Sequence, residues 1–347
     1  MDSCVTRARL APQIALVGAL ALAVLAWRAL HRDVLVVYCA HDAVYSERIL
    51  KNFERSTGTR IAVRFDTEAT KSLGLVELIK REQAAPRCDV FWNNETLGTL
   101  DLQKDGLLEP YQGSGFARIP AAFKDPQGHW TGFAARLRVY IANTARLGAT
   151  PDAAAVEACF AAPDLSSVAV AKPLYGTTLT HYSVLWQQWG SERLKAWHSD
   201  ARRRGLRELQ GNAATKDAVA GGACVAGWTD TDDFFVAKDE GQPVAMLPIR
   251  VENGATVCIP NSVAIIRGTR HGDAARKLVD FLLSAETELA LARSKSRQIP
   301  LGPVPESELP AEVRELQRWA TDAFALDAKT LAARNECLAW LKSGAAQ

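Results

Sequence analysis

The chain has 347 residues, and its 41 basic and 39 acidic side chains leave a net charge of +2. The basic residues are spread along the chain, with only 202–204 as a run, so a nucleic-acid-binding protein with a basic face is not indicated. The composition, 48% hydrophobic and 23% charged, is that of an ordinary globular protein. Because a single hydrophobic core stops growing below this length, we expect two lobes.

The N-terminal segment carries a strongly apolar stretch. Residues 10–27 contain no charge, and Arg7 and Arg9 precede them. This fits a secretory signal, whose apolar region spans about 7–15 residues, or a transmembrane anchor near the lower limit of about 17. The small-residue cleavage candidates lie inside the apolar run, and its end at Trp27-Arg28 is a poor cleavage site. We therefore predict that 1–32 form a signal peptide or membrane anchor, and we favour the uncleaved anchor.

The seven cysteines are widely spaced, without a C-x-x-C pair. A zinc ribbon and a redox pair are therefore not encoded. An exported location would permit disulfides, but the sequence does not give a pairing. We expect Cys39, inside an apolar run, to be a buried free thiol.

The first hundred residues alternate between strand and helix patterns. Strands are predicted at 33–39, 60–65 and 89–92, and helices at 44–56 and 73–81. This order indicates a parallel sheet, and such sheets bind ligands at the carboxyl ends of their strands. Six polar residues in the loops at that edge are therefore candidate ligand contacts: His41, Asp42, Thr70, Lys71, Asn94 and Glu95.

The second half of the chain adds further candidates. An extended segment at 130–142 carries Arg136 and Arg138, and a strand is predicted at 168–171. The turn Gly176-Thr177-Thr178 then opens a helix, Asn212 lies where another begins, and a strand follows at 255–267. The remainder reads as helical at 274–294 and 311–341. A Gly-Thr-Thr turn offers N–H groups and hydroxyls to an anion, although it is also a common N-cap.

Residues 227–233 crowd three carboxylates and two hydroxyls into one stretch. They follow the apolar run 218–226, so we expect a strand that ends here and turns into a helix. Helix capping accounts for one or two of these groups. The remaining carboxylates repel one another unless a cation, a donor-rich ligand or a proton lies among them. A ligand site and a well-capped helix both remain open for Asp230, Thr231, Asp232 and Asp233.

Several short motifs together resemble the periplasmic solute-binding proteins of bacterial ABC importers, in the branch that contains ferric-ion-binding proteins. They lie at 37–38, 88–95, 106–110, 133–139, 176–178, 227–233 and 296–301. The resemblance implies a type II periplasmic-binding-protein fold, with two α/β lobes, a hinge, and a cleft that closes on a ligand. It implies lobe 1 from 33–134 with 261–347, and lobe 2 from 135–260. It also implies the periplasmic side of the inner membrane, anchored or secreted, with an ABC importer permease as partner.

One departure from the family pattern concerns the ligand. Iron-binding members place two adjacent tyrosines where this chain has Thr231-Asp232. The resemblance puts His41 or Asp42 near the family's histidine, and Asn94 or Glu95 near its acidic ligand. It also assigns an accompanying anion to Arg136 or Arg138, Gly176, Thr177, Thr178 and Asn212. The residues that would bind the anion are therefore retained, whereas the residues that would bind the metal differ from those of the family.

Two ligand classes fit these residues. A metal ion with a synergistic anion would use His41, Glu95 and Asp232. A phosphorylated small molecule, such as a sugar phosphate, would place its phosphate on the arginines and helix N-termini, and its hydroxyls on Asp230, Asp232 and Asp233. No cofactor is expected apart from that possible metal ion.

An enzyme is the alternative reading, since Asp230 and Asp232 could perform acid–base hydrolysis of a sugar or phosphate ester. Against it, residues 113–115 are not a nucleophile elbow, and neither an H-E-x-x-H motif nor a P-loop is present. We therefore expect a binding protein and not an enzyme.

Overall fold

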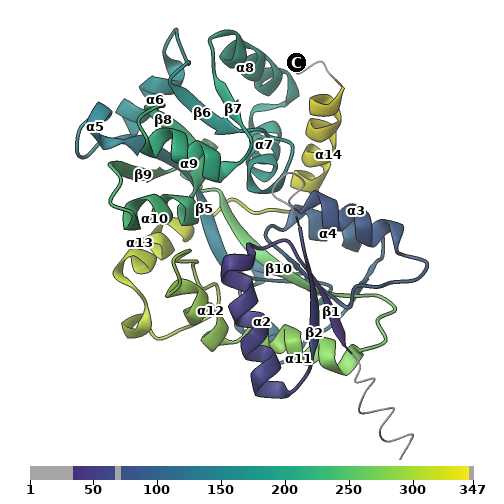
Figure 1. The fold of residues 1–347 in the computed structure, drawn as a ribbon. Coiled ribbons are helices and arrows are strands. Elements are labelled where there is room, and N and C mark those ends of the chain that lie inside the picture. The colour runs from purple at the N-terminus through teal and green to yellow at the C-terminus, as the bar shows by residue number, and fades with distance from the viewer. Residues whose placement is uncertain (1–33, 67–71, 344–347) are drawn as a thin grey trace, which may run out of the picture.

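The computed structural model describes residues 34–66 and 72–343, which form a mixed α/β fold around a ten-stranded sheet (Figure 1). The strand order is β2-β1-β3-β10-β5-β8-β6-β7, with β4 paired to β10 and β9 paired to β5. The strands are β1 Leu35–Cys39, β2 Ile61–Phe65, β3 Val90–Asn93, β4 Leu108–Glu109, β5 Thr131–Asn143, β6 Val168–Ala171, β7 Arg207–Leu209, β8 Ala226–Asp230, β9 Val244–Pro248 and β10 Cys258–Ile266.

Helices cover both halves of this sheet. The α-helices are α2 Ala43–Thr57, α3 Leu73–Arg81, α4 Leu97–Lys104, α5 Thr144–Leu147, α6 Ala153–Ala161, α7 Gly176–Trp189, α8 Ser191–Arg203, α9 Asn212–Ala220, α10 Thr231–Asp239, α11 Gly272–Leu282, α12 Ala285–Ala292, α13 Ala311–Ala320 and α14 Ala328–Lys342. Four short 3-10 turns complete the described chain: η1 Phe116–Arg118, η2 Ala121–Phe123, η3 Glu252–Gly254 and η4 Glu306–Glu308.

Strand β5 joins the two halves of the molecule. Its first part pairs with β10, which continues through β3 to the parallel strands β1 and β2. Its second part pairs with β8 and β9, and β8 leads to the parallel strands β6 and β7. Since β5 is 13 residues long, it spans both halves without a break in the chain. The lobe boundaries near 134–135 and 260–261 stay a prediction.

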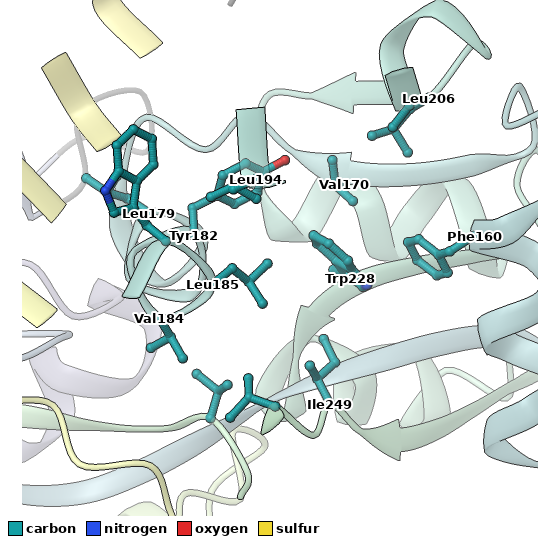
Figure 2. Packing of buried hydrophobic residues seen from close by; sticks show 14 of the residues in the cluster. Phe160, Val170, Leu179, Tyr182, Val184, Leu185, Leu194, Leu206, Trp228 and Ile249 are labelled. Atoms are coloured by element: carbon teal, nitrogen blue, oxygen red, sulfur yellow. The ribbon is translucent and has the colours of Figure 1, made fainter. Parts of the chain in front are cut away.

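Each half has its own hydrophobic core. One cluster surrounds β1, β3 and α2, and includes Leu35, Phe53 and Trp92. The other lies around β8 and α7, and includes Tyr182 and Trp228 (Figure 2). The C-terminal helix α14 contributes to this second cluster and lies beside α7 (Figure 1).

The strand expected to end at the acidic stretch is confirmed, since it ends at Asp230 and α10 begins at Thr231, but it starts later than the apolar run 218–226 indicated. Residues 218–220 are the last turn of α9, which ends at Gly221 and Gly222, and the strand is Ala226–Asp230. Only the start of the strand was misplaced, because an apolar run alone does not separate a helix end from a strand. Gly227 lies inside the strand, where a Cβ would come within 2.7 Å of the carbonyl oxygen of Ala169. Glycine therefore lets β6 and α9 approach β8 closely.

The helical pattern over 311–341 is broken into two helices, α13 and α14. The prediction for Cys39 is confirmed, since it is a buried free thiol, and the other five described cysteines are free thiols as well. The predicted signal or anchor at 1–32 lies outside the described residues. Within 34–66 and 72–343, no helix is long and apolar enough to cross a membrane.

Helix α14 is tied to α4 through a partly buried cluster of charges. Asp101 of α4 accepts from Lys80 Nζ at 2.8 Å and from Arg334 Nη1 of α14 at 3.3 Å. Burial alone would raise the pKa of Asp101, but Lys80 and Arg334 outweigh burial and hold the pKa below its usual value. The ionised carboxylate is therefore the form that the folded state favours.

Because the pKa of Asp101 is lowered in the folded state, its contribution to stability is present above the unfolded pKa of about 3.9 and is lost as the pH falls through the folded pKa. We expect Asp101→Asn to reduce the free energy of unfolding by about 1–3 kcal/mol at pH 7, and by less below about pH 4. Urea unfolding at several pH values measures both.

The matched control is Asp105→Asn, which removes a more exposed partner of the same Lys80 ammonium. Exposed ion pairs contribute little, so its effect should stay below about 1 kcal/mol. Equal effects of the two variants, or an Asp101 effect that does not depend on pH, would contradict the assignment.

Candidate functional site

A polar cavity of about 200 Å³ lies where the two halves of the sheet meet. Segments from both halves contribute, since Asp42 and Asn94 follow β1 and β3, whereas the remaining loops follow β6, β7 and β8. We call it the cleft cavity. Its lining consists of Asp42, Asn94, Arg136, Ala171, Lys172, Tyr175, Gly176, Thr177, Thr178, Gln210, Gly211, Asn212, Ala213, Asp230, Asp232 and Asp233.

Three helices begin at this cavity. Helices α7, α9 and α10 start at Gly176, Asn212 and Thr231, directly after the turns that line it. In none of them does the N-cap side chain accept a backbone N–H. Asp230 is the N-cap residue of α10, so the capping interpretation of this carboxylate fails. Helix N-termini without side-chain caps offer N–H donors and the positive end of the helix dipole to an anion.

Asp230 is held by a buried network. Its Oδ1 accepts from Arg138 Nη1 at 2.7 Å, and its Oδ2 accepts from Thr177 Oγ1 at 2.5 Å and Asn212 Nδ2 at 3.0 Å. The network joins β5, β8, α7 and α9. Arg138 itself is fully buried and does not line the cavity, so it positions Asp230 and the two helix starts from behind.

Arg136 lines the cavity directly and links both halves. Its Nη1 donates to the carbonyl oxygen of Asn94 at 2.7 Å, and its Nη2 donates to Asn261 Oδ1 at 3.3 Å. Its Nε lies 3.4 Å from Asp232 Oδ2, an ion pair whose geometry falls short of a hydrogen bond. Arg136 and Arg138 lie two residues apart on β5 and so share one face of the strand.

Three carboxylates stand close together on one side of the cavity. Oxygen atoms of Asp230, Asp232 and Asp233 lie within 4.8 Å of one another. Burial raises the pKa of Asp233 well above its usual value, and the charges of Asp232 and Asp230 raise it further. The hydrogen bond that Asp233 Oδ2 accepts from Thr229 Oγ1 at 3.0 Å lowers this pKa and so partly offsets the repulsion.

Other residues predicted from the sequence lie outside the cleft cavity. His41 is buried, and the Gln298 amide oxygen, in the orientation that satisfies its neighbours, accepts from His41 Nε2 at 3.1 Å and Arg136 Nη2 at 3.0 Å. Glu95 accepts the backbone N–H groups of Leu97 and Gly98 at the start of α4, at 2.6 and 2.8 Å.

Thr231 also faces away from the cavity, because its Oγ1 accepts the Leu137 N–H at 3.3 Å. Thr70 and Lys71 lie outside the described residues. The structure therefore does not bring together His41, Glu95 and Asp232, which were predicted as a metal set. It does gather at the cavity Asp42, Asn94, Arg136, Gly176, Thr177, Thr178, Asn212, Asp230, Asp232 and Asp233.

Lys172, Tyr175 and Gln210 line the cavity but were not predicted. Lys172 and Gln210 directly follow β6 and β7, so the rule that found the polar loops after the first three strands would also have found them. Lys172 is exposed, which leaves its ammonium available to a ligand.

The fold recurs in solved proteins of low sequence identity. Apo ferric ion-binding protein A from Pasteurella haemolytica superposes with a TM-score of 0.75 at 20% identity, covering 90% of this chain and 98% of that one. AfuA from Actinobacillus pleuropneumoniae, with fructose-6-phosphate bound, gives a TM-score of 0.70 at 19% identity, covering 89% and 98%. The predicted α/β fold with two lobes is thereby confirmed.

A curated relative is iron uptake protein A1 of Synechocystis, 24% identical over 268 residues, or 73% of this chain and 72% of that protein. The profile of the family described as bacterial extracellular solute-binding protein matches residues 35–294, well over half of the chain. The resemblance drawn from the motifs is therefore correct, and the chain belongs to the bacterial extracellular solute-binding protein family.

Proposed function

We propose that the protein captures a phosphorylated small molecule, such as a sugar phosphate, in the cleft cavity and delivers it to an ABC importer. The observation that carries this proposal is the convergence of three helix N-termini without side-chain caps on one polar cavity. Phosphate oxygens accept backbone N–H groups and favour the positive helix ends. Arg136 and Lys172 add two cationic side chains to the same lining.

The acidic side of the cavity suits the other end of such a ligand. Asp42 and Asp232 are oxygen acceptors that hydroxyl groups of a polyol can donate to. Burial raises the pKa of Asp233 well above its usual value, which favours the protonated form that can donate to a hydroxyl oxygen. Fructose-6-phosphate is bound by AfuA, whose fold this chain shares, which supports the choice of a phosphate ester.

A metal ion with a synergistic anion is the second candidate. The three carboxylates within 4.8 Å of one another favour it, as do the iron-related names of several proteins that share the fold. Against it, both oxygen atoms of Asp230 are already bonded within the fold, to Arg138, Thr177 and Asn212. The two tyrosines of iron-binding members are absent, so no phenolate pair would hold Fe³⁺. We infer that binding needs no metal and involves no turnover.

Removing the cationic groups tests the anion half. We expect Arg136→Met and Lys172→Met each to weaken the binding of fructose 6-phosphate by about 10–100-fold, because each removes a charge-assisted hydrogen bond of about 1.5–3 kcal/mol. Isothermal titration calorimetry measures the affinity. Lys51→Met, on the exposed face of α2, is the control and should bind normally. Since Lys172 is exposed, its variant separates lost binding from lost folding.

The carboxylate Asp232 separates the two ligand classes. If it accepts hydroxyl groups, Asp232→Asn should reduce the affinity by about 1–3 kcal/mol, and chelators should change nothing in either protein. If it ligates a metal, chelation should abolish binding by the wild type, and the substitution should remove the metal. Native mass spectrometry of protein from its own host identifies a co-purified ester or ion. Full-strength binding by a variant with Asp230, Asp232 and Asp233 all changed to Ala would refute the site in either form.

The N-terminal segment bears on the cellular location of the protein. We propose that it works on the periplasmic side of the inner membrane and that residues 10–27 tether it there, since the cleavage sites are poor. Cell fractionation followed by N-terminal sequencing should find Met1 or Asp2 in the membrane fraction. A soluble periplasmic form that begins between Ala23 and Asp33 would show the tether to be wrong.

A further inference from the structure

A second cavity lies in the same half of the molecule as β8. Its lining includes Phe160, Trp228 and Ile249, which belong to the hydrophobic cluster drawn in Figure 2. Its volume is about 390 Å³, within the range typical of small-molecule sites and larger than the cleft cavity. No residue lines both cavities. We call it the aromatic cavity, because its walls include five aromatic rings: Tyr140, Phe160, Trp189, Trp197 and Trp228.

Three of these rings are nearly parallel. The Phe160 and Trp197 rings each lie 5.2 Å from the Trp228 ring, at interplanar angles of 13°. Tyr140, Trp189 and Trp197 are only partly buried, so part of each ring is open to an incoming molecule, and the Arg193 guanidinium lies over the Trp189 ring, 5.0 Å from its centroid. Flat aromatic surfaces in this arrangement favour a planar partner that extends the stack.

The inner wall holds polar atoms that the fold does not satisfy. His181 is fully buried, its ring lies 4.7 Å from that of Trp228, and both of its nitrogen atoms are without a hydrogen-bond partner in the described part of the chain. The same holds for the indole N–H of Trp228. An unpaired buried donor or acceptor costs about 1–3 kcal/mol, so a molecule that supplies partners gains free energy here.

The charges around the cavity indicate that this molecule is uncharged. Burial lowers the pKa of His181 well below its usual value, and the positive charge of Arg138 lowers it further, so the imidazole is neutral. Asp200 and Arg204 form an ion pair at 2.8 Å and cancel each other. The remaining charged residues of the lining, Glu157 and Arg250, are exposed and of opposite sign.

We propose that the aromatic cavity is a second binding site, which takes an uncharged planar heteroaromatic molecule of one or two rings that carries both a hydrogen-bond donor and an acceptor. The ring of Trp197 stacks on it, and Trp189, whose ring stands at 70° to that of Trp197, contacts its edge. His181, whose neutral ring has one donor and one acceptor nitrogen, and the Trp228 N–H recognise its polar edge. This site is separate from the cleft cavity and does not depend on the function proposed for that cavity.

Adenine is a suitable probe, because it is a neutral bicyclic heterocycle with donors and acceptors on its edge. Calorimetry on the full chain should give one bound adenine per protein with a Kd below about 1 mM, and a crystal soaked with adenine should show it against Trp197. Absence of binding at that concentration overturns the proposal, as does adenine located in the cleft cavity.

Two substitutions test the recognition. Trp197→Ala removes a stacking surface and should weaken adenine binding at least tenfold. His181→Phe keeps a ring but removes both nitrogen atoms; it should weaken binding at least fivefold, while thermal unfolding shows the protein intact. Trp340→Ala, which removes an equally large ring packed on Trp186 outside the cavity, should bind like the wild type. Unchanged affinity in both cavity variants would refute the assignment.

Discussion

The buried ion pair between Arg138 and Asp230 is the interaction on which the geometry of the cleft cavity depends. An arginine that is fully buried needs a carboxylate partner, since an unpaired charge in the interior is strongly destabilising. Asp230 is that partner. Its second carboxylate oxygen accepts hydrogen bonds from Thr177 and Asn212, and so holds the first turns of α7 and α9 in place. One ion pair between adjacent strands thus aims two helix N-termini, with α10 starting at the next residue.

The same ion pair explains why helix N-termini suited to an anion and acidic side chains lie at one cavity. If Asp230 acted as an N-cap, α10 would be satisfied internally and the acidic stretch would serve helix stability. Because its oxygens are turned to Arg138, Thr177 and Asn212, the helix start keeps no side-chain cap. Asp232 is likewise balanced by Arg136 across the cavity. Two of the carboxylates that line the cavity, Asp230 and Asp232, are thus paired with arginines, which reduces their repulsion of a bound anion.

Local patterns in the sequence sufficed for β1, β2, β3, β5, β6 and β10 and for the sheet edge where ligands bind, whereas the short strands β4, β7 and β9 were not predicted. The alternation of strands and helices placed Asp42 and Asn94 at one edge, the Gly-Thr-Thr turn added Thr177, and the structure places all three at the cleft cavity. The sequence did not predict the roles of side chains whose bonding partners lie far away along the chain. Asp230 meets Arg138 across 92 positions, and His41 meets Gln298 across 257. Glu95 looks like a ligand in a polar loop, yet its oxygens are used two and three residues away by the start of α4.

Helix α7 and strand β8 each serve both cavities through their own periodicity. Thr177 and His181 are four residues apart and share one face of α7, whereas Asp230 and Trp228 are two apart and share one face of β8. Thr177 meets Asp230 at the cleft cavity, and His181 meets Trp228 one turn further along at the aromatic cavity. Arg138 lies near both contacts, since it bonds Asp230 and its charge lowers the pKa of His181. A shift of α7 along β8 would therefore alter both cavities together, because neither contact can move without the other.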